Sequence, residues 1–430
     1  MLTERLRSGL HDDFYSYMAE QGHFLWKGSD VVKAKPVVWI CIILLIAVNS
    51  AISVAQNRHV VLTDEELLGK LIFIDKNLSN PPTQACIDCH MPRAGWTSPN
   101  SEMNLNVGIL PGAVRDRFGT RKAPTASYAT FAPVFDGSQG GNFWDGRAEG
   151  EVNLRTGEVL QTPATDQAGE PFLNPLEMNN ASKEEVCEKI SVSQYAKLFE
   201  DVWGPDSLDC RPDVVDETYT LISLSIAAYE ASPEVNQFSS KFDAFLADEA
   251  TLTDQEQEGM TLVKEHCGCH SFVDDPHANP GPEQVLFTNF KYFNIGVPSN
   301  PNNPILHNDP TFVDKGLGEL QGPSQNGKFK TPTLRNVDQR PEDGFVKAYM
   351  HNGVFKSLKE VVHFYNARNR MIKNGTLKPE VSENIIAFNN KRGKIFNLGL
   401  TNEQEDSIVA FLKTLSDQRT VFGPQVPSDT

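Results

Sequence analysis

Two short Cys–His elements, each preceded by the same helix-opening motif, constrain this 430-residue chain more than any other feature. The motif Leu-Thr-Asp begins at Leu62 and again at Leu252, and in both copies a glutamate follows the threonine three positions later. This spacing is a capping box, so each copy is expected to open a helix. The two helices lead to Cys86–His90 and to Cys267–His270. The chain therefore repeats one plan, which predicts two homologous domains.

Each half also closes on an apolar helical segment. In the second half four apolar residues recur at helical spacing, namely Ile408, Phe411, Leu412 and Leu415. The first half has an apolar run that indicates a largely buried helix, with Leu221, Leu224, Ile226 and Ala228. We expect a mainly α fold with few strands, whose tandem domains span about residues 60–245 and 250–422 and join near residues 248–251.

The first Cys–His element matches the pattern that attaches haem c. In Cys86-Ile87-Asp88-Cys89-His90 the two thiols are spaced to add to two vinyl groups on one porphyrin edge, and the next imidazole ligates the iron. A zinc knuckle and a thioredoxin-type redox pair are the alternatives. A zinc site needs further thiols or imidazoles nearby, and no other Cys or His occurs between His90 and Cys187. The pattern therefore favours haem.

The second element departs from this pattern. His266-Cys267-Gly268-Cys269-His270 has one residue rather than two between its thiols. Cys269 and His270 keep one thioether next to the iron ligand, whereas Cys267 either joins the other vinyl by a shortened link, eased by Gly268, or stays free. The repeat still predicts a second haem c here. Attachment through one thioether and a vestigial, haem-free site are the alternatives.

The N-terminal segment predicts export. Nineteen residues from Val37 to Ala55 carry no charge, basic residues precede them, and Ser53-Val54-Ala55 resembles a small-x-small cleavage site. A cleaved signal and an uncleaved membrane anchor are both compatible with this segment, and a buried core helix is the third alternative. The first two place residues 56–430 in the periplasm.

An oxidising compartment permits disulfides. Cys187 and Cys210 are then the natural pair, because Cys41 lies in the export segment and the other four cysteines belong to the Cys–His elements. Two unpaired buried thiols are the alternative.

Seven further motifs follow one another along residues 60–420: Leu68–Leu71, Ala123–Thr125, Phe143–Ala148, Asn174–Met178, Asn294–Pro298, Phe329–Val337 and Tyr349–Gly353. Together with the Cys–His elements they resemble the dihaem cytochrome c peroxidase/MauG family. The resemblance implies two class-I cytochrome c domains, each with one covalent haem c. One haem reacts with peroxide, and the other receives and passes electrons.

The resemblance also implies roles for residues around the first haem. His90 would be the proximal ligand at the peroxide site, and Glu177 the acid/base that moves a proton between the peroxide oxygens. Gln167 and Pro171 match a glutamine and a proline of the distal pocket. Trp144 matches a tryptophan that relays charge between the haems, with a plain core position as the alternative.

Two departures from the family pattern concern iron ligands. The chain has no His between His90 and His266, so we expect the first haem to be five-coordinate and ready for peroxide without reductive activation. Tyr365 lies twelve residues after Gly353, where peroxidases place the Met ligand of the second haem and MauG-like proteins place Tyr. A phenolate lowers the reduction potential of iron. Met350 and Met371 are the alternative ligands.

A third departure concerns calcium. The family holds a calcium ion between the haems, with an Asn before the Ala-Pro-Thr motif, and this chain has Lys122 there. Calcium is therefore doubtful.

These features predict a periplasmic dihaem peroxidase that reduces hydrogen peroxide to water with electrons from a small c-type cytochrome or a cupredoxin. The net charge of −17 suits a basic donor and argues against an extended nucleic-acid surface. The main alternative is a MauG-like enzyme that stores two oxidising equivalents across both haems and oxidises side chains of a partner protein. A simple electron carrier, with both irons six-coordinate, is the third hypothesis. A homodimer is among the assemblies that the resemblance implies.

Overall fold

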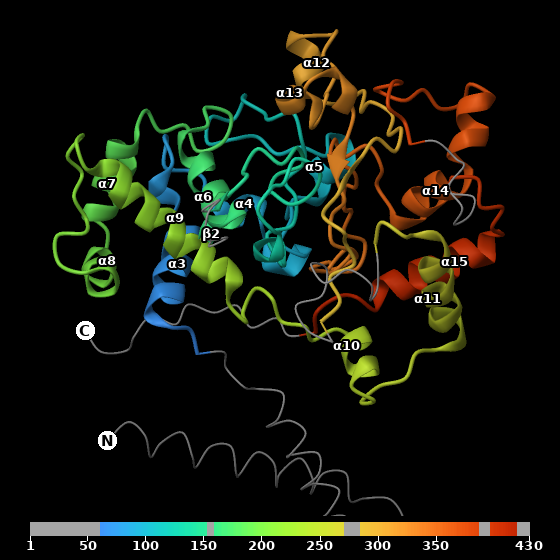
Figure 1. Cartoon of the computed structure of the whole chain (residues 1–430), viewed down its shortest axis with the longest axis horizontal. Coiled ribbons are helices and arrows are strands. Elements are labelled where there is room, and N and C mark those ends of the chain that lie inside the picture. The colour runs from blue at the N-terminus through green and yellow to red at the C-terminus, as the bar shows by residue number, and fades with distance from the viewer. Residues whose placement is uncertain (1–60, 153–158, 271–283, 387–395, 419–430) are drawn as a thin grey trace, which may run out of the picture. The chain divides into compact units, whose positions relative to one another are not determined.

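The computed structural model describes residues 61–152, 159–270, 284–386 and 396–418, and most of their regular structure is helical (Figure 1). The predicted export segment lies outside the described residues. The elements are α3 (Asp64–Ile74), η1 (Lys76–Leu78), α4 (Cys86–Cys89), η2 (Pro92–Ala94), α5 (Ser101–Asn106), η3 (Ala129–Phe131), β1 (Glu151–Val152), β2 (Val159–Gln161), α6 (Pro163–Leu173), α7 (Lys183–Ser191), α8 (Ala196–Trp203), α9 (Val215–Ala231), α10 (Lys241–Leu246), α11 (Asp254–His266), β3 (Tyr292–Phe293), α12 (Ile305–Asn308), α13 (Gly318–Gln321), η4 (Pro323–Gln325), β4 (Phe329–Lys330), α14 (Leu358–Lys373) and α15 (Asn402–Lys413).

The described residues form few strands, as the sequence predicts, and each of these strands is short. In the described parts of the chain they form two antiparallel pairs, β1 with β2 and β3 with β4, and the second pair aligns Tyr292 with Lys330 and Phe293 with Phe329. None of the helices in the described part of the chain has the length and apolar character needed to cross a bilayer.

The repeated helix openings are confirmed. The Thr63 hydroxyl accepts from the Glu66 amide at 3.2 Å while the Thr63 amide donates to the Glu66 carboxylate at 2.7 Å, and Thr253 with Glu256 does the same at 3.3 and 2.7 Å. These capping boxes satisfy amides that the first turn of a helix leaves without partners. They start α3 and α11 at equivalent positions of the two halves.

The two halves also repeat one close helix crossing. Helix α3 packs against α9, and α11 packs against α15 (Figure 1). A Cβ atom at Gly69 of α3 would lie 1.8 Å from the Ser225 carbonyl oxygen, and one at Gly259 of α11 would lie 1.9 Å from that of Ser407. Each crossing therefore requires a residue without a side chain, and both glycines come six positions after the capping threonine.

Each half has its own hydrophobic core. The first core gathers buried residues of α3, α6, α8 and α9, including Leu68, Phe172, Phe199 and Ile226. The second gathers buried residues of α10, α11, α14 and α15, including Phe242, Val263, Val362 and Phe411. Residues 60–430 nonetheless form one compact unit, so the division into two domains near residue 250 stays a prediction.

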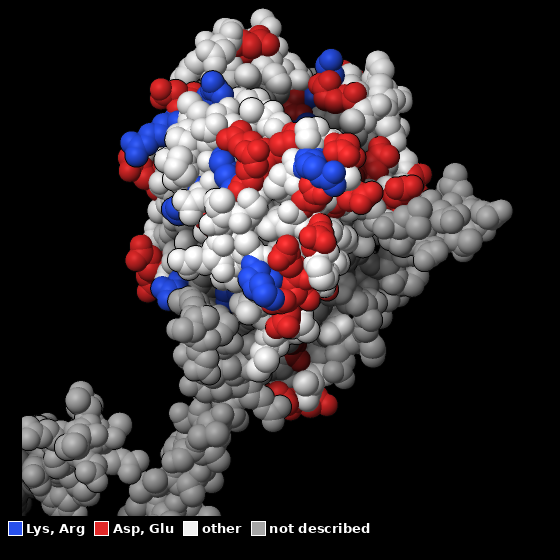
Figure 2. Space-filling view, turned by 90° about the vertical axis from the view of Figure 1, so that its left-hand side faces the viewer, with Lys and Arg blue, Asp and Glu red and all other residues white. Residues whose placement is uncertain are grey.

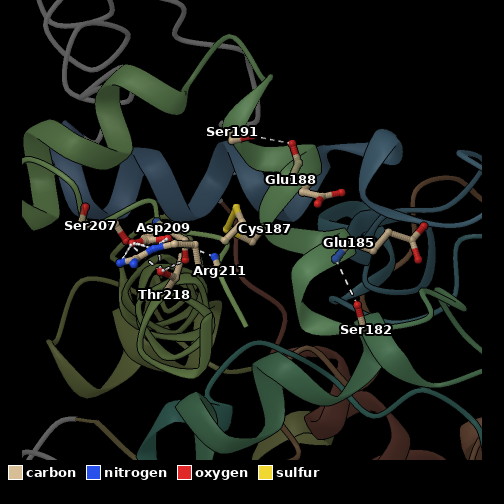
Figure 3. Close-up of a disulfide and its surroundings, with 10 residues drawn as sticks. Ser182, Glu185, Cys187, Glu188, Ser191, Ser207, Asp209, Arg211 and Thr218 are labelled. Atoms are coloured by element: carbon tan, nitrogen blue, oxygen red, sulfur yellow. Dashed lines mark hydrogen bonds and ion pairs between the residues drawn. A yellow bond between two sulfur atoms is a disulfide. The ribbon is translucent and has the colours of Figure 1, made fainter. Parts of the chain in front are cut away.

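The predicted disulfide is confirmed. Cys187 of α7 is bonded to Cys210, which lies in the loop before α9, with the two Cα atoms 5.5 Å apart (Figure 3). The loop is also held on its other side, because the Thr218 hydroxyl of α9 donates to the Asp209 carbonyl at 2.9 Å. The bond therefore ties α7 to the loop that leads into the N-terminal end of α9.

Candidate functional site

The structure brings the predicted residues of the first site together around one cavity of about 370 Å³. The cavity is lined by Cys86, Cys89 and His90 of the first Cys–His element. It is also lined by the other residues that the resemblance assigns to this site, namely Trp144, Gln167, Pro171 and Glu177. Residues 330–333 and 347–350 of the second half complete the lining.

His90 is held as a neutral imidazole by hydrogen bonding to main-chain carbonyl groups. Its Nδ1 lies 3.2 Å from the carbonyl oxygen of Trp96, and because a carbonyl only accepts, Nδ1 carries the proton. Burial lowers the pKa of His90 to about 4, so the ring stays uncharged at neutral pH. An imidazole whose N–H is anchored on a carbonyl and whose Nε2 is unprotonated is the usual state of a metal ligand.

The two thiols beside His90 suit covalent attachment of haem. Cys86 and Cys89 begin and end the four-residue helix α4, both line the cavity, and neither is in a disulfide. Burial raises the pKa of Cys86 well above its usual range and that of Cys89 to about 12. The Gln84 amide donates to the Cys89 sulfur at 3.2 Å and orients it. Two neutral thiols, a neutral imidazole and a large cavity together fit haem c.

Glu177 lies on the same cavity, just beyond the end of α6. The Asn174 side-chain amide donates to a Glu177 carboxylate oxygen at 3.2 Å. Burial raises the pKa of Glu177, the nearby carboxylate of Glu170 raises it further, and the Arg147 guanidinium opposes both. Glu177 is thus an anchored carboxyl group that takes up a proton more readily than an ordinary glutamate.

The other two residues of the predicted distal pocket lie on α6. Gln167 and Pro171 lie on this helix and line the cavity, as the resemblance implies, and β1 and β2 form the hairpin that precedes it. Among the described residues that line the cavity, His90 is the only histidine.

The second site surrounds a smaller cavity of about 180 Å³. Helix α11 ends at His266, and Cys267, Cys269 and His270 follow it onto the cavity wall. The Nδ1 of His270 lies 2.8 Å from the Phe287 carbonyl oxygen, so this ring is oriented in the same way as His90. Burial lowers its pKa. A Cβ atom at Gly268 would meet open space, so close contacts do not explain this glycine.

Tyr365 of α14 lines this second cavity together with His270. Its ring stacks on Phe396 with centroids 5.2 Å apart and planes 15° apart. Burial raises its pKa above the usual range, and the nearby thiols raise it further. Met350 also lines the cavity, whereas Met371 packs in the adjoining hydrophobic cluster. The geometry therefore keeps Tyr365 and Met350 as candidate ligands and places Met371 apart from the described lining.

Trp144 lies in the wall that the two cavities share, since it lines both. Its indole N–H donates to the Lys122 carbonyl at 2.8 Å, and its own carbonyl accepts from the Lys330 amide at 2.9 Å. These bonds join it to a segment of each half.

Two buried polar groups near the cavities were not found from the sequence. The Arg121 guanidinium pairs with Asp145 at 2.5 Å and with Asp314 at 2.6 Å, which links the halves. Glu230 is 5% exposed and lines the first cavity, and burial raises its pKa to about 8. The sequence could have indicated Glu230, because it is a single glutamate at the end of the apolar run of α9. No sequence pattern around Arg121 indicates that it is buried in an ion pair.

The calcium ion that the resemblance implies does not fit residue 122. Calcium is bound by oxygen atoms. The Lys122 ammonium has hydrogen-bond donors and no lone pair, so it cannot be a calcium ligand. That ammonium is buried in the wall and donates to the Ala123 carbonyl at 3.0 Å.

Comparisons with known proteins point to one family. The family model described as di-haem cytochrome c peroxidase matches residues 63–251. The methylamine utilization protein MauG of Paracoccus denitrificans is 32% identical over 369 residues, which cover 82% of this chain and 88% of that protein. The cytochrome c551 peroxidase of Nitrosomonas europaea is 27% identical over 359 residues, covering 83% and 80%.

Solved structures give the same result for the fold. The diheme peroxidase BthA of Burkholderia thailandensis superposes with a TM-score of 0.66 at 28% identity, covering 82% of this chain and 86% of that one. A MauG-like protein associated with microbial copper homeostasis superposes with a TM-score of 0.53 at 22% identity, covering 83% and 91%, and supports the fold alone.

Proposed function

Since the chain belongs to the dihaem cytochrome c peroxidase family, which includes MauG, we propose that it is a periplasmic enzyme that reduces hydrogen peroxide to water. One haem c would be held by Cys86, Cys89 and His90, and the other by the residues of Cys267–His270. The observation that carries the proposal is the position of Glu177, an anchored carboxyl group on the cavity that His90 lines.

At the first site, His90 would hold the haem and Glu177 would move a proton. When bound, haem supplies the iron and the electrons that cleave the O–O bond. His90 would hold it through Nε2, because Nδ1 is engaged with Trp96. Glu177 would accept the proton from the near peroxide oxygen and return it to the far oxygen, so that water leaves. Its raised pKa suits this role, since the carboxyl group must keep the proton between the two transfers.

Electrons would come from a small c-type cytochrome or a cupredoxin through the second site. Trp144 would relay charge between the two sites, and its position in the lining of both cavities supports this role. Acidic side chains spread over the face that carries α7 and α8, with fewer basic ones among them (Figure 2), and the whole chain has a net charge of −17. Such a surface favours encounter with a basic donor.

The test is the Glu177→Gln variant of the haem-loaded protein. Gln keeps the size of the side chain but cannot take up the proton, so peroxide-driven oxidation of a reduced cytochrome c should slow by about a hundredfold or more. The absorbance spectra of both haems should stay nearly unchanged. Glu188→Gln is the matched control, because Glu188 of α7 is exposed and does not line the cavity. Turnover that survives in Glu177→Gln would show that the base is misassigned.

A MauG-like reaction on a partner protein is the second candidate. Tyr365 on the second cavity and the 32% identity to MauG favour it. Spectra of the diferric protein after peroxide, with and without reduced cytochrome c, separate the two. Rapid oxidation of the donor supports the peroxidase, and a long-lived oxidised state that ignores the donor supports the MauG-like enzyme. No reaction with peroxide would contradict both.

A further inference from the structure

Lys122 lies in the shared wall beside Trp144. The residue is 9% exposed and lines the first cavity. Its carbonyl accepts the indole N–H at 2.8 Å, and its ammonium nitrogen lies 6.0 Å from the centroid of the indole ring. Lys122 therefore acts on Trp144 both through its backbone and through its charge.

The charge of Lys122 is poorly compensated within the protein. Its ammonium donates to the carbonyl of Ala123, the next residue. Burial lowers its pKa to about 8. Among the described residues, the ammonium contacts the Ala123 carbonyl and the indole face of Trp144 and forms no ion pair with a carboxylate. Buried lysines are almost always paired. The wall thus presents a positive charge to the group that fills the cavity. The propionate groups of a haem are anions that could pair with this charge.

A second buried ammonium lies close by. The Lys347 nitrogen donates to three carbonyl oxygens, of Ala94 at 2.7 Å, Gln339 at 3.0 Å and Asn336 at 3.3 Å. Burial lowers the pKa of Lys347, and the charge of Lys122 lowers it further. Converging carbonyl oxygens are ligands that calcium prefers, and here the chain's own ammonium holds them.

We propose that Lys122 is a built-in cation that takes the place of an exchangeable calcium ion in the wall between the two sites, with Lys347 holding the neighbouring carbonyl oxygens. A charge fixed to the chain is not lost on dilution or chelation. The protein should therefore keep both sites intact without calcium. This inference rests on the proposed dihaem function for the identity of the sites, but its first test does not depend on peroxide chemistry.

The first test uses the haem-loaded wild-type protein, dialysed into calcium-free buffer. We expect elemental analysis to find far less than one calcium per chain. Excess EGTA should change neither the absorbance of the two haems nor the midpoint of thermal unfolding. Stoichiometric calcium, or a spectral or thermal change with EGTA, would overturn the proposal. Loss of peroxide activity alone would count against the proposed function and leave this result standing.

The second test restores a ligand in place of the ammonium. Lys122→Asn supplies a carboxamide oxygen, so the variant should become calcium-dependent, with donor oxidation about tenfold slower in EGTA than in millimolar calcium. Lys122→Met removes the charge without adding a ligand, and it should be slow in both buffers. Lys197→Asn, the same substitution on the exposed surface of α8, should match the wild type. If Lys122→Asn and Lys122→Met equal the wild type in EGTA, the charge is dispensable and the proposal fails. If neither variant folds, the calcium content of the wild type still decides.

Discussion

Replacing Gly259 by alanine should force α11 away from α15 and disturb the second haem site before the first. The added Cβ would lie 1.9 Å from the Ser407 carbonyl oxygen, whereas ordinary contact begins at 3.4 Å. Ser407 presents backbone of α15 at this point, and backbone cannot rotate out of the way as a flexible side chain can. The two helices must therefore separate.

The size of the effect follows from two opposing contributions. Overpacking a buried contact usually costs about 1–3 kcal/mol, and a backbone obstacle belongs at the upper end of that range. Alanine favours a helix over glycine by about 1 kcal/mol. The free energy of unfolding should therefore fall by about 2 kcal/mol. Because α11 ends at His266, its displacement should also strain the 2.8 Å bond between His270 and Phe287.

The assay is urea denaturation followed by circular dichroism and by the absorbance of each haem. Gln255→Ala is the control on the same helix, because Gln255 is exposed on α11 and lines neither cavity, and it should stay within about 0.5 kcal/mol of wild type. A Gly259→Ala variant as stable as Gln255→Ala would refute the close contact. Equal changes in the absorbance of both haems would refute the expectation that the crossing of α11 with α15 supports the second site and not the first.

Three further predictions concern the disulfide, a buried carboxyl group and the shared wall. Replacing Cys187 and Cys210 by alanine should lower the free energy of unfolding by about 3 kcal/mol, as expected for a separation of 23 residues, and an unchanged guanidinium midpoint would mean that the bond contributes nothing. Burial raises the pKa of Glu230 from 4.5 to about 8, so between these values the folded state binds a proton that the unfolded state has lost. Stability should then fall as pH rises through this window, and Glu230→Gln should flatten the fall in urea titrations; an equally steep fall would contradict the assignment. Trp144→Phe should leave both haem spectra intact and slow the passage of electrons in stopped-flow mixing, and a variant as fast as wild type would remove Trp144 from the electron path.

Features encoded over short stretches were predictable from the sequence. The capping boxes of Thr63 and Thr253 depend on residues three positions apart, so both helix starts were correct. The pairing of Cys187 with Cys210 followed from the compartment and from the use of the other cysteines. The placement of Glu177 and Gln167 on the cavity of His90 agrees with the motif resemblance, while their roles stay predictions.

Features made by distant residues were not predictable. Arg121 and Asp314 are 193 positions apart, and neither has a pattern that anticipates their ion pair. The Lys347 ammonium gathers carbonyl oxygens from Ala94 and Asn336, which any residue type supplies. Such contacts depend on how the halves pack, and hydrophobic periodicity carries no information about that.

The composition of the first cavity limits how freely this chain can be divided. Although His90 and Glu177 both precede residue 250, residues 330–333 and 347–350 supply part of the wall around them. A fragment that ended near residue 250 would keep its own hydrophobic core and the thiols of Cys86 and Cys89, yet its pocket would open to water on one side. The two halves share their helix openings and crossings but are not interchangeable, and neither could be transplanted as a single-haem cytochrome without rebuilding the missing wall.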